Sequence, residues 1–240
     1  MKALIFRLHL REPVLVAQAG AGEENSAVGL PYIPGSALRG ALAARWLARH
    51  GGVDLAIDPV GRARFLDGTL CYLNAYPELG GQRTLPVPAS WFTEKNLAED
   101  EYATIYDLAI APRGGPLKPP GGGSFVHLDY TEPEEAWEEP QGRATLVRAA
   151  RADQVHITLD DVNHRREGNQ VFRYEALAPD QSFIGVIAGP ENQDLSEIRE
   201  LLDDGDLLLG SAHLAGYGRA ATEVIEEVPA GWQECPVKKA

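Results

Sequence analysis

The sequence has 240 residues, of which 44% are hydrophobic and 24% are charged, and this globular usage excludes wholesale disorder. The formal net charge is −13, but the acidic residues are concentrated, because residues 94–139 carry eleven of them against three basic residues. The basic side chains are mostly arginines at 39–49, 143–151 and 165–173, so a local anion-binding surface is not excluded.

No apolar run reaches the roughly 18 residues that a membrane span needs, so no membrane partner is expected. Arg7 and His9 interrupt the N-terminal apolar stretch, so it does not resemble a signal peptide. The two cysteines, Cys71 and Cys235, are isolated, which excludes a disulfide scaffold and a zinc ribbon. This cysteine usage predicts a reducing, cytoplasmic location.

The first half of the chain predicts one strand and one helix with clear boundaries. Apolar residues alternate over 2–16, which indicates a half-buried strand that Pro13 ends or bulges. Ser36 is a good N-cap for a helix that runs to about His50. Weaker signals predict a mixed loop at 51–68, a strand at 69–76 and a Pro/Gly connector at 112–124.

The second half predicts further short elements. Strands are expected at 154–160 and 170–175, joined as a hairpin across Val162 to Asn169. The other expected elements are a buried strand at 183–188, an amphipathic helix at 195–202, and strands at 206–209 and 221–228.

If residues 51–153 are treated as an insertion, the element order is strand, helix, strand, strand, helix, strand. That βαββαβ order is typical of the ferredoxin-like, or RRM-like, fold. We therefore expect an α+β single domain over 1–240, with a Pro/Gly-rich insertion at 51–153 and a glycine-rich loop near its C-terminal end.

The segment at 32–46 opens the predicted helix with candidate anion ligands. Free N–H groups and the positive end of the helix dipole can seat a phosphate, and Arg39 in the first turn can reinforce it. Ser36 and Arg39 are therefore candidate phosphate contacts. An ordinary capped helix with solvated arginines fits the spacing as well.

A glycine-rich loop follows Leu209 and forms the second candidate site. Closely spaced glycines allow backbone conformations closed to other residues and leave room for a ligand backbone. The aromatic rings can stack on a base and the arginine can meet a phosphate. A twisted hairpin with a bulge explains the pattern equally well. The candidate residues are Gly210, His213, Gly216, Tyr217, Gly218 and Arg219.

The tip of the predicted hairpin, residues 163–169, concentrates hydrogen-bond donors. Arg165 and Arg166 suit phosphate contacts, although a solvated turn explains such a string as well. No spacing predicts a metal site, and no nucleotide-binding or hydrolase motif is present. Neither a metal nor a cofactor is therefore expected.

These motifs resemble the RAMP superfamily of CRISPR-associated proteins. The pattern from Leu209 to Gly218 resembles the glycine-rich loop of that superfamily, and IPGSALRGAL at 33–42 resembles its first helix. The segments 75–95, 106–110, 117–126 and 171–177 are similar to the Cas-five-like subunit family of type III-D effectors called Csx-ten.

The resemblance implies a structural role. Such subunits bind the CRISPR guide RNA (crRNA) at its repeat-derived 5′ handle, next to a Cas-ten-like large subunit and Cas-seven-like backbone subunits. Ser36, Arg39 and the three loop glycines match the motifs, whereas the other candidates extend from them. We therefore expect this protein to have no catalytic activity of its own.

Two enzymatic alternatives remain open. A Cas-seven-like backbone subunit cleaves target RNA with a loop aspartate, but residues 17–31 contain Glu23 and Glu24 and no aspartate. A Cas-six-like repeat-processing endoribonuclease uses a histidine as general acid or base, for which His213 is the best candidate. A ferredoxin-like interaction domain that binds no RNA is a further alternative.

The acidic segment 94–139 would repel RNA if it lay on the RNA-binding face. We therefore expect it to face outward or towards a basic partner subunit.

Overall fold

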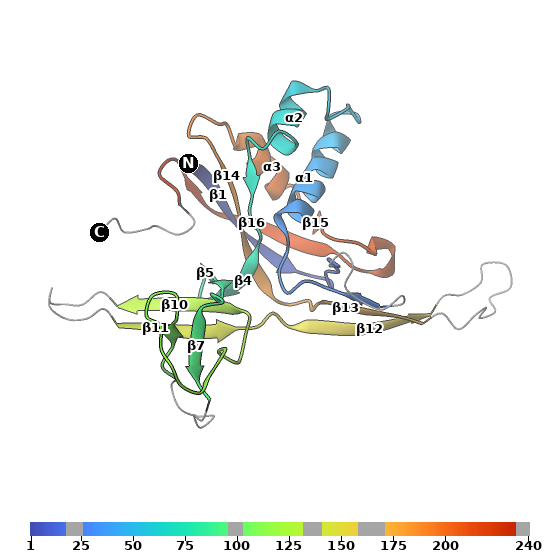
Figure 1. The fold of residues 1–240 in the computed structure, drawn as a ribbon. Helices are drawn as coiled ribbons and strands as arrows, with labels where there is room; N and C mark the ends of the chain where they lie inside the picture. Colours follow the sequence, from blue (N-terminus) through green and yellow to red (C-terminus); the bar gives the residue numbers. More distant parts are fainter. Residues whose placement is uncertain (18–25, 96–102, 132–140, 158–170, 234–240) are drawn as a thin grey trace. The chain divides into compact units, whose positions relative to one another are not determined.

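The computed structural model describes residues 1–17, 26–95, 103–131, 141–157 and 171–233 (Figure 1). The fold is mixed α+β, with many strands and few helices. The chain divides into two compact units. Unit 1 consists of Met1–Glu78 and Ala149–Ala240, and unit 2 consists of Leu79–Arg148. In the described residues, no helix is long and apolar enough to cross a membrane.

An antiparallel sheet forms the centre of unit 1. Its strands follow the order β15-β16-β1-β14-β4, and β3 also pairs with β14. The bounds are β1 Lys2–Leu10, β3 Cys71–Tyr72, β4 Tyr76–Leu79, β14 Ser182–Gly189, β15 Leu207–Leu208 and β16 Arg219–Val228. The predicted alternation is confirmed, because Leu4, Phe6, Leu8 and Leu10 of β1 are all fully buried.

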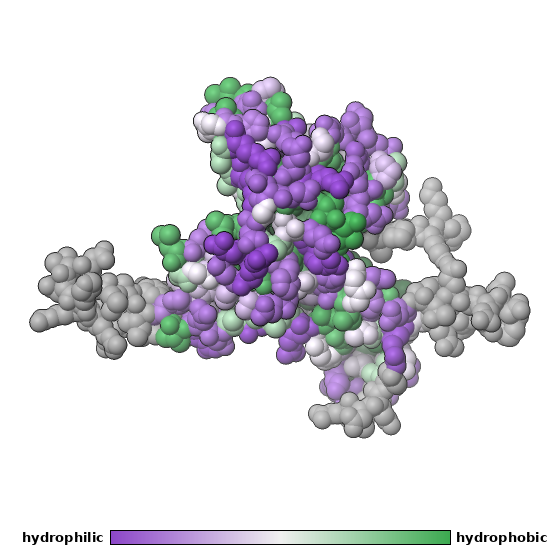
Figure 2. Space-filling model, turned by 180° about the vertical axis from the view of Figure 1, so that it is seen from behind, coloured by the Kyte–Doolittle hydropathy of each residue, from purple (hydrophilic) through white to green (hydrophobic). Residues whose placement is uncertain are grey.

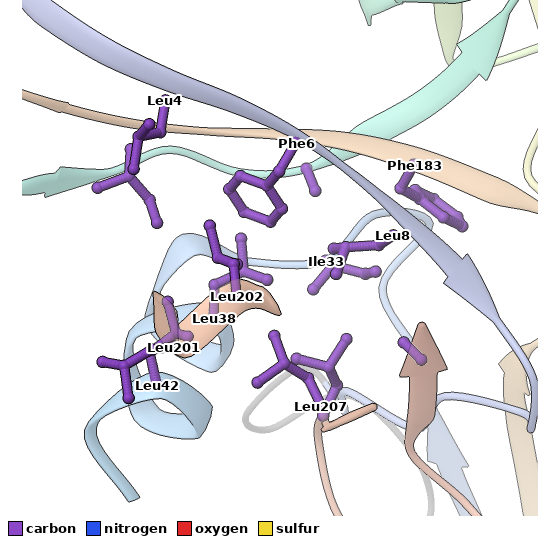
Figure 3. Packing of buried hydrophobic residues seen from close by; sticks show 14 of the residues in the cluster. Leu4, Phe6, Leu8, Ile33, Leu38, Leu42, Phe183, Leu201, Leu202 and Leu207 are labelled. Carbon is purple, nitrogen blue, oxygen red and sulfur yellow. The ribbon is translucent and has the colours of Figure 1, made fainter. Parts of the chain in front are cut away.

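Helices α1, Gly35–Arg49, and α3, Ser196–Asp203, pack on one face of this sheet. Figure 3 shows Leu38 and Leu42 of α1 together with Leu201 and Leu202 of α3 near Phe6 of β1. Burial of each such side chain contributes roughly 1.5–3 kcal/mol. The expected helices at 36–50 and 195–202 are thus confirmed within one residue. A third helix, α2 at Pro59–Phe65, lies where a loop was expected.

The beginning of α1 differs from the prediction in its cap. Ser36 was expected at the N-cap, but Pro34 occupies that position and no side chain of the helix caps it. Instead, the side-chain oxygen of Asn74 accepts a 3.0 Å hydrogen bond from the backbone N–H of Gly35. A Cβ at Gly35 would lie 1.8 Å from the carbonyl oxygen of Tyr72, so the helix begins in contact with the chain around β3.

Three further strands form a second sheet in unit 1. They follow the order β12-β13-β2 and span Arg151–Ile157, Val171–Leu177 and Ser26–Val28. β12 and β13 pair antiparallel, which confirms the predicted hairpin, whereas β2 adds in parallel to β13 and was not expected. The hairpin tip, residues 158–170, lies outside the described residues.

Unit 2 consists of short strands in two sheets, of order β11-β10-β6 and β8-β7-β9. Their bounds are β6 Leu85–Pro86, β7 Trp91–Glu94, β8 Tyr106–Asp107, β9 Leu117–Lys118, β10 Phe125–Thr131 and β11 Gln141–Val147, and β5 is Gln82–Arg83. The insertion was expected at 51–153. Within that interval residues 79–148 form unit 2, and 51–78 contribute α2, β3 and most of β4 to unit 1.

The surface in Figure 2 is mainly hydrophilic, with hydrophobic residues gathered in small separate patches. Such scattered apolar exposure is ordinary for a surface in contact with water.

Candidate functional site

The three arginines of α1 have different environments. Arg45 donates hydrogen bonds to the carbonyl oxygens of Leu201, at 2.7 Å, and Asp206, at 2.5 Å, where α3 ends. Burial lowers the pKa of Arg45, but guanidinium remains charged because its pKa starts so high. Arg49 forms an ion pair of 2.9 Å with Asp204. Both side chains therefore join α1 to α3.

Arg39, by contrast, is exposed, and none of the described residues forms an ion pair with it. It lines a pocket of about 220 Å³ at the beginning of α1, together with Gly35, Ser36, Leu70, Cys71 and Tyr72. Burial raises the pKa of Tyr72, so its phenol stays neutral, and the hydroxyl donates to the carbonyl of Arg64. Arg39 is therefore the permanent charge that lines this pocket.

The glycine-rich loop uses its three glycines in two different ways. Gly210, Gly216 and Gly218 all have positive φ angles, of 75°, 81° and 101°. A Cβ at Gly210 would lie 2.2 Å from the carbonyl oxygen of Leu15, and one at Gly218 would lie 2.5 Å from that of Leu209. A Cβ at Gly216 would meet no atom within 4 Å. Gly210 and Gly218 thus permit close packing, whereas Gly216 supplies only backbone conformation.

A groove of about 640 Å³ lies between α1 and this loop. One side consists of small residues on successive turns of α1, namely Ala37, Gly40, Ala41, Ala44 and Ala48. Gly210 and the exposed His213 line it from the loop, and an imidazole nitrogen of His213 lies 3.4 Å from the carbonyl oxygen of Leu209. The groove thus brings small residues of the first motif to the glycine-rich loop, whereas the predicted contacts Ser36 and Arg39 line the separate pocket at the beginning of α1.

Tyr217 and Arg219 are not placed as the sequence suggested. The side chain of Tyr217 is only 1% exposed, so its ring has no free face for a base and does not fit the stacking role. Arg219 is half exposed, and its guanidinium forms an ion pair of 3.3 Å with Glu12. A phosphate at Arg219 would therefore have to compete with a carboxylate.

The remaining candidates lie outside the described residues. These are Arg165 and Arg166 at the hairpin tip, Glu23 and Glu24 before β2, and the glutamates of the acidic segment at 132–139. Among the described residues, no group of three or more metal-ligating side chains comes together.

The small residues of α1 were not identified from the sequence as one side of a groove. Ala37, Ala41, Ala44 and Ala48 recur at intervals of three and four, which places them on one face of a helix. That spacing was the available signal. Alanines in a helix are so common, however, that only the facing loop makes them part of a groove.

A family model of the RAMP superfamily matches residues 13–221, which is most of the chain. The match includes both the start of α1 and the glycine-rich loop. This chain therefore belongs to the RAMP superfamily. No curated protein matches the sequence.

Solved structures with the same fold come from a type III-B CRISPR complex, Cmr-beta. A chain of its apo state has a TM-score of 0.52 at 13% identity, over 93% of this chain and 97% of that one. A chain of the complex bound to cognate target RNA has a TM-score of 0.50 at 14% identity, over 92% and 96% of the two chains. At such identities the likeness shows the fold alone.

Proposed function

We propose that this protein is a guide-RNA-binding subunit of a type III CRISPR effector complex and holds the repeat-derived 5′ handle of the crRNA. The observation that carries the proposal is the meeting of both superfamily motifs along α1. Arg39 is exposed in the pocket at the beginning of the helix, and Gly210 and His213 line the groove along the face of the same helix that carries its small residues. The exposed guanidinium suits a phosphate, and the groove of small side chains on the same helix leaves room for a ligand backbone.

The strand order supports a ferredoxin-like core within this proposal. Along the sequence, the core strands are β1 (first), β3 with β4 (second), β14 (third) and β16 (fourth). Across the sheet they lie in the order fourth, first, third, second. Helices α1 and α3 lie between the first and second and between the third and fourth of them. This order supports a split βαβ arrangement. Its second strand, β3 with β4, lies within 51–153, which was expected to be an insertion, and the strands expected at 154–160 and 170–175 instead belong to the separate sheet of β12 and β13.

The proposed partners follow from the superfamily. The Cmr-beta structures come from a multi-subunit complex, and one of them holds target RNA. We therefore propose crRNA, a Cas-ten-like large subunit and Cas-seven-like backbone subunits as partners. The resemblance to the Csx-ten family makes the handle-binding position our first choice.

Removal of Arg39 tests the site directly. Each phosphate contact on single-stranded RNA contributes about −0.7 to the slope of log affinity against log salt. Arg39→Ala should weaken binding of a guide RNA that carries the repeat-derived 5′ handle and reduce the magnitude of that slope by about 0.7. Fluorescence anisotropy over a series of salt concentrations measures both effects.

Arg49→Ala is the matched control, because it removes the same side chain from the same helix where Asp204 already neutralises it. The control should leave the slope unchanged, and urea denaturation should show both variants folded. A folded Arg39→Ala protein with the slope of the parent would show that the site is wrong.

A Cas-seven-like backbone role is the second candidate. The superfamily match and the end-to-end likeness to a Cmr-beta chain, over more than nine tenths of both chains, fit a backbone subunit as well as a handle-binding one. A backbone subunit that cleaves target RNA would need a catalytic side chain, and Glu23 is the nearest substitute for the loop aspartate. The carboxylate would have to be held in a productive geometry beside the scissile phosphate.

We expect no cleavage by this subunit, because its exposed candidate acid–base, His213, contacts only a backbone carbonyl among the described residues. Incubation with repeat RNA and with guide-complementary RNA, alone and in an effector whose other nucleases are inactivated, tests this. Cleavage that disappears with Glu23→Gln would identify the backbone alternative. Cleavage that disappears with His213→Ala would identify the repeat-processing alternative.

Co-purification of the effector followed by RNA sequencing tests the class. A uniform guide population with repeat-derived 5′ ends is the expected result. If the subunit instead assembles into the complex without binding RNA, it is an interaction domain.

A further inference from the structure

The side chain of Tyr217 connects the glycine-rich loop to the second sheet of unit 1. It emerges between Gly216 and Gly218 and packs in a small buried cluster with Leu15 and Ala176. Its ring meets that of Tyr174 edge to face, with centroids 6.0 Å apart. The residue that follows the exposed part of the loop is thus buried against β13.

The Tyr217 hydroxyl makes two hydrogen bonds to β12. It donates to the side-chain oxygen of Gln154, at 2.5 Å, and lies 2.9 Å from Nε2 of His156. Because its one proton points to Gln154, the hydroxyl accepts from His156, and Nε2 of that ring carries the hydrogen. Burial and the neighbouring Tyr174 raise the pKa of Tyr217, so the phenol remains a donor at neutral pH.

The two parts of the loop are held differently. At its base, the N–H of Ser211 donates to the carbonyl of Leu15, and that of Gly218 donates to the carbonyl of Pro13, at 3.0 and 2.8 Å. The tip, His213–Ala215, is exposed and lies between two left-handed residues, Ala212 and Gly216. Of the two side chains next to the tip, Ala212 packs against the buried cluster, and Tyr217 both packs there and makes hydrogen bonds to β12.

We propose that Tyr217 is a positioning residue, whose hydroxyl fixes the loop tip to Gln154 and His156 of β12 so that His213 faces the groove along α1. The proposal rests on the proposed function for its RNA consequence, because the groove is the RNA site assigned above. Without the hydroxyl, the tip can pivot about Ala212 and Gly216, and bound RNA loses a fixed surface on one side of the groove.

Two measurements test the proposal, one of which needs no RNA. In Tyr217→Phe, the amides of 211–218 should exchange with deuterium about tenfold faster than in the parent, because one hydrogen-bonded anchor is lost. Guide RNA with the repeat-derived 5′ handle should dissociate roughly 3- to 10-fold faster, the change that corresponds to one hydrogen bond.

Matched variants separate hydrogen bonding from packing. His156→Gln keeps an N–H donor that can reach the hydroxyl and should behave as the parent within about twofold. His156→Leu leaves the hydrogen bond to Gln154 and should show part of the Tyr217→Phe effect. In the double variant of Tyr217→Phe and His156→Leu, the effect should equal that of Tyr217→Phe alone, because the hydroxyl that His156 contacts is already absent. Tyr106→Phe in unit 2, which removes a hydroxyl bonded to Glu94, should change neither measurement.

The outcomes are distinguishable from failure of the proposed function. Unchanged exchange in Tyr217→Phe would overturn the proposal, and so would faster exchange with unchanged RNA dissociation from the folded protein. If the parent binds no RNA, the proposed function fails. The anchoring of the loop tip is then decided by deuterium exchange alone.

Discussion

The two ends of α1 carry the same residue type but use it for different purposes. Near the end of the helix, the donors of Arg45 are directed at the carbonyl oxygens of Leu201, Gly205 and Asp206. In the first turn, Arg39 is exposed beside a pocket and pairs with none of the described acidic residues. The comparison teaches that an arginine whose donors meet protein carbonyls contributes to the fold, whereas an exposed one in a pocket is available to an anion.

The largest effect that follows from this comparison concerns Arg45. Arg45→Ala removes a guanidinium that satisfies carbonyl groups in the last turn of α3 and just after it, and these groups have no intrahelical partner. Hydrogen bonds from a charged group contribute about 1.5–3 kcal/mol, so we expect the free energy of unfolding to fall by about 2 kcal/mol. Urea denaturation with linear extrapolation measures the change.

The same variant sharpens the contrast with Arg39. Arg45 lines the groove as well, but its donors are directed at protein carbonyls, so the folded Arg45→Ala protein should keep the salt slope of RNA binding. Arg45→Lys should lose part of the stability, since an ammonium on a flexible stem does not reproduce the planar fork. A slope reduced by about 0.7 in Arg45→Ala would mean that the two ends of α1 do not differ as proposed.

The sequence predicted the elements of unit 1 far better than the contacts between them. Alternating or helical apolar spacing located β1, α1, β14 and α3, because burial of one face imposes a period. The partners of Arg45 lie more than 150 residues away along the chain. No local pattern in the helix predicts them.

The glycine-rich loop shows the same limit for the candidate site. The positive φ angles follow from the glycines themselves. Whether Tyr217 points outward or inward could not be predicted, because a loop has no periodic face. Its buried position depends on Gln154, His156 and Tyr174, which the hairpin supplies from elsewhere in the chain.

Unit 2 was the least predictable region. Its strands β5, β6, β8 and β9 are two residues long, so no alternation can develop within them. The hairpin of β10 and β11 falls in a region where acidic and polar residues obscure the pattern. Short strands of this kind are defined by their pairing partners more than by their own composition.

The smaller effect concerns the cap at the beginning of α1, where Asn74 replaces the expected Ser36. Asn74→Ala removes the side-chain acceptor of the Gly35 N–H and should lower the free energy of unfolding by about 1 kcal/mol, as for other N-cap acceptors. Ser36→Ala is the matched control, because Ser36 makes no capping hydrogen bond, and it should change stability by less than about 0.5 kcal/mol. Urea denaturation of the two variants side by side makes the comparison.

An equal loss in both, or a larger loss in Ser36→Ala, would restore the serine as the cap and remove the structural role of Asn74. If instead Asn74→Ala alone is destabilised, the beginning of α1 is held by the chain between β3 and β4. The hydroxyl of Ser36 is then free, like the guanidinium of Arg39 one turn later, to contact a ligand in the pocket that both residues line.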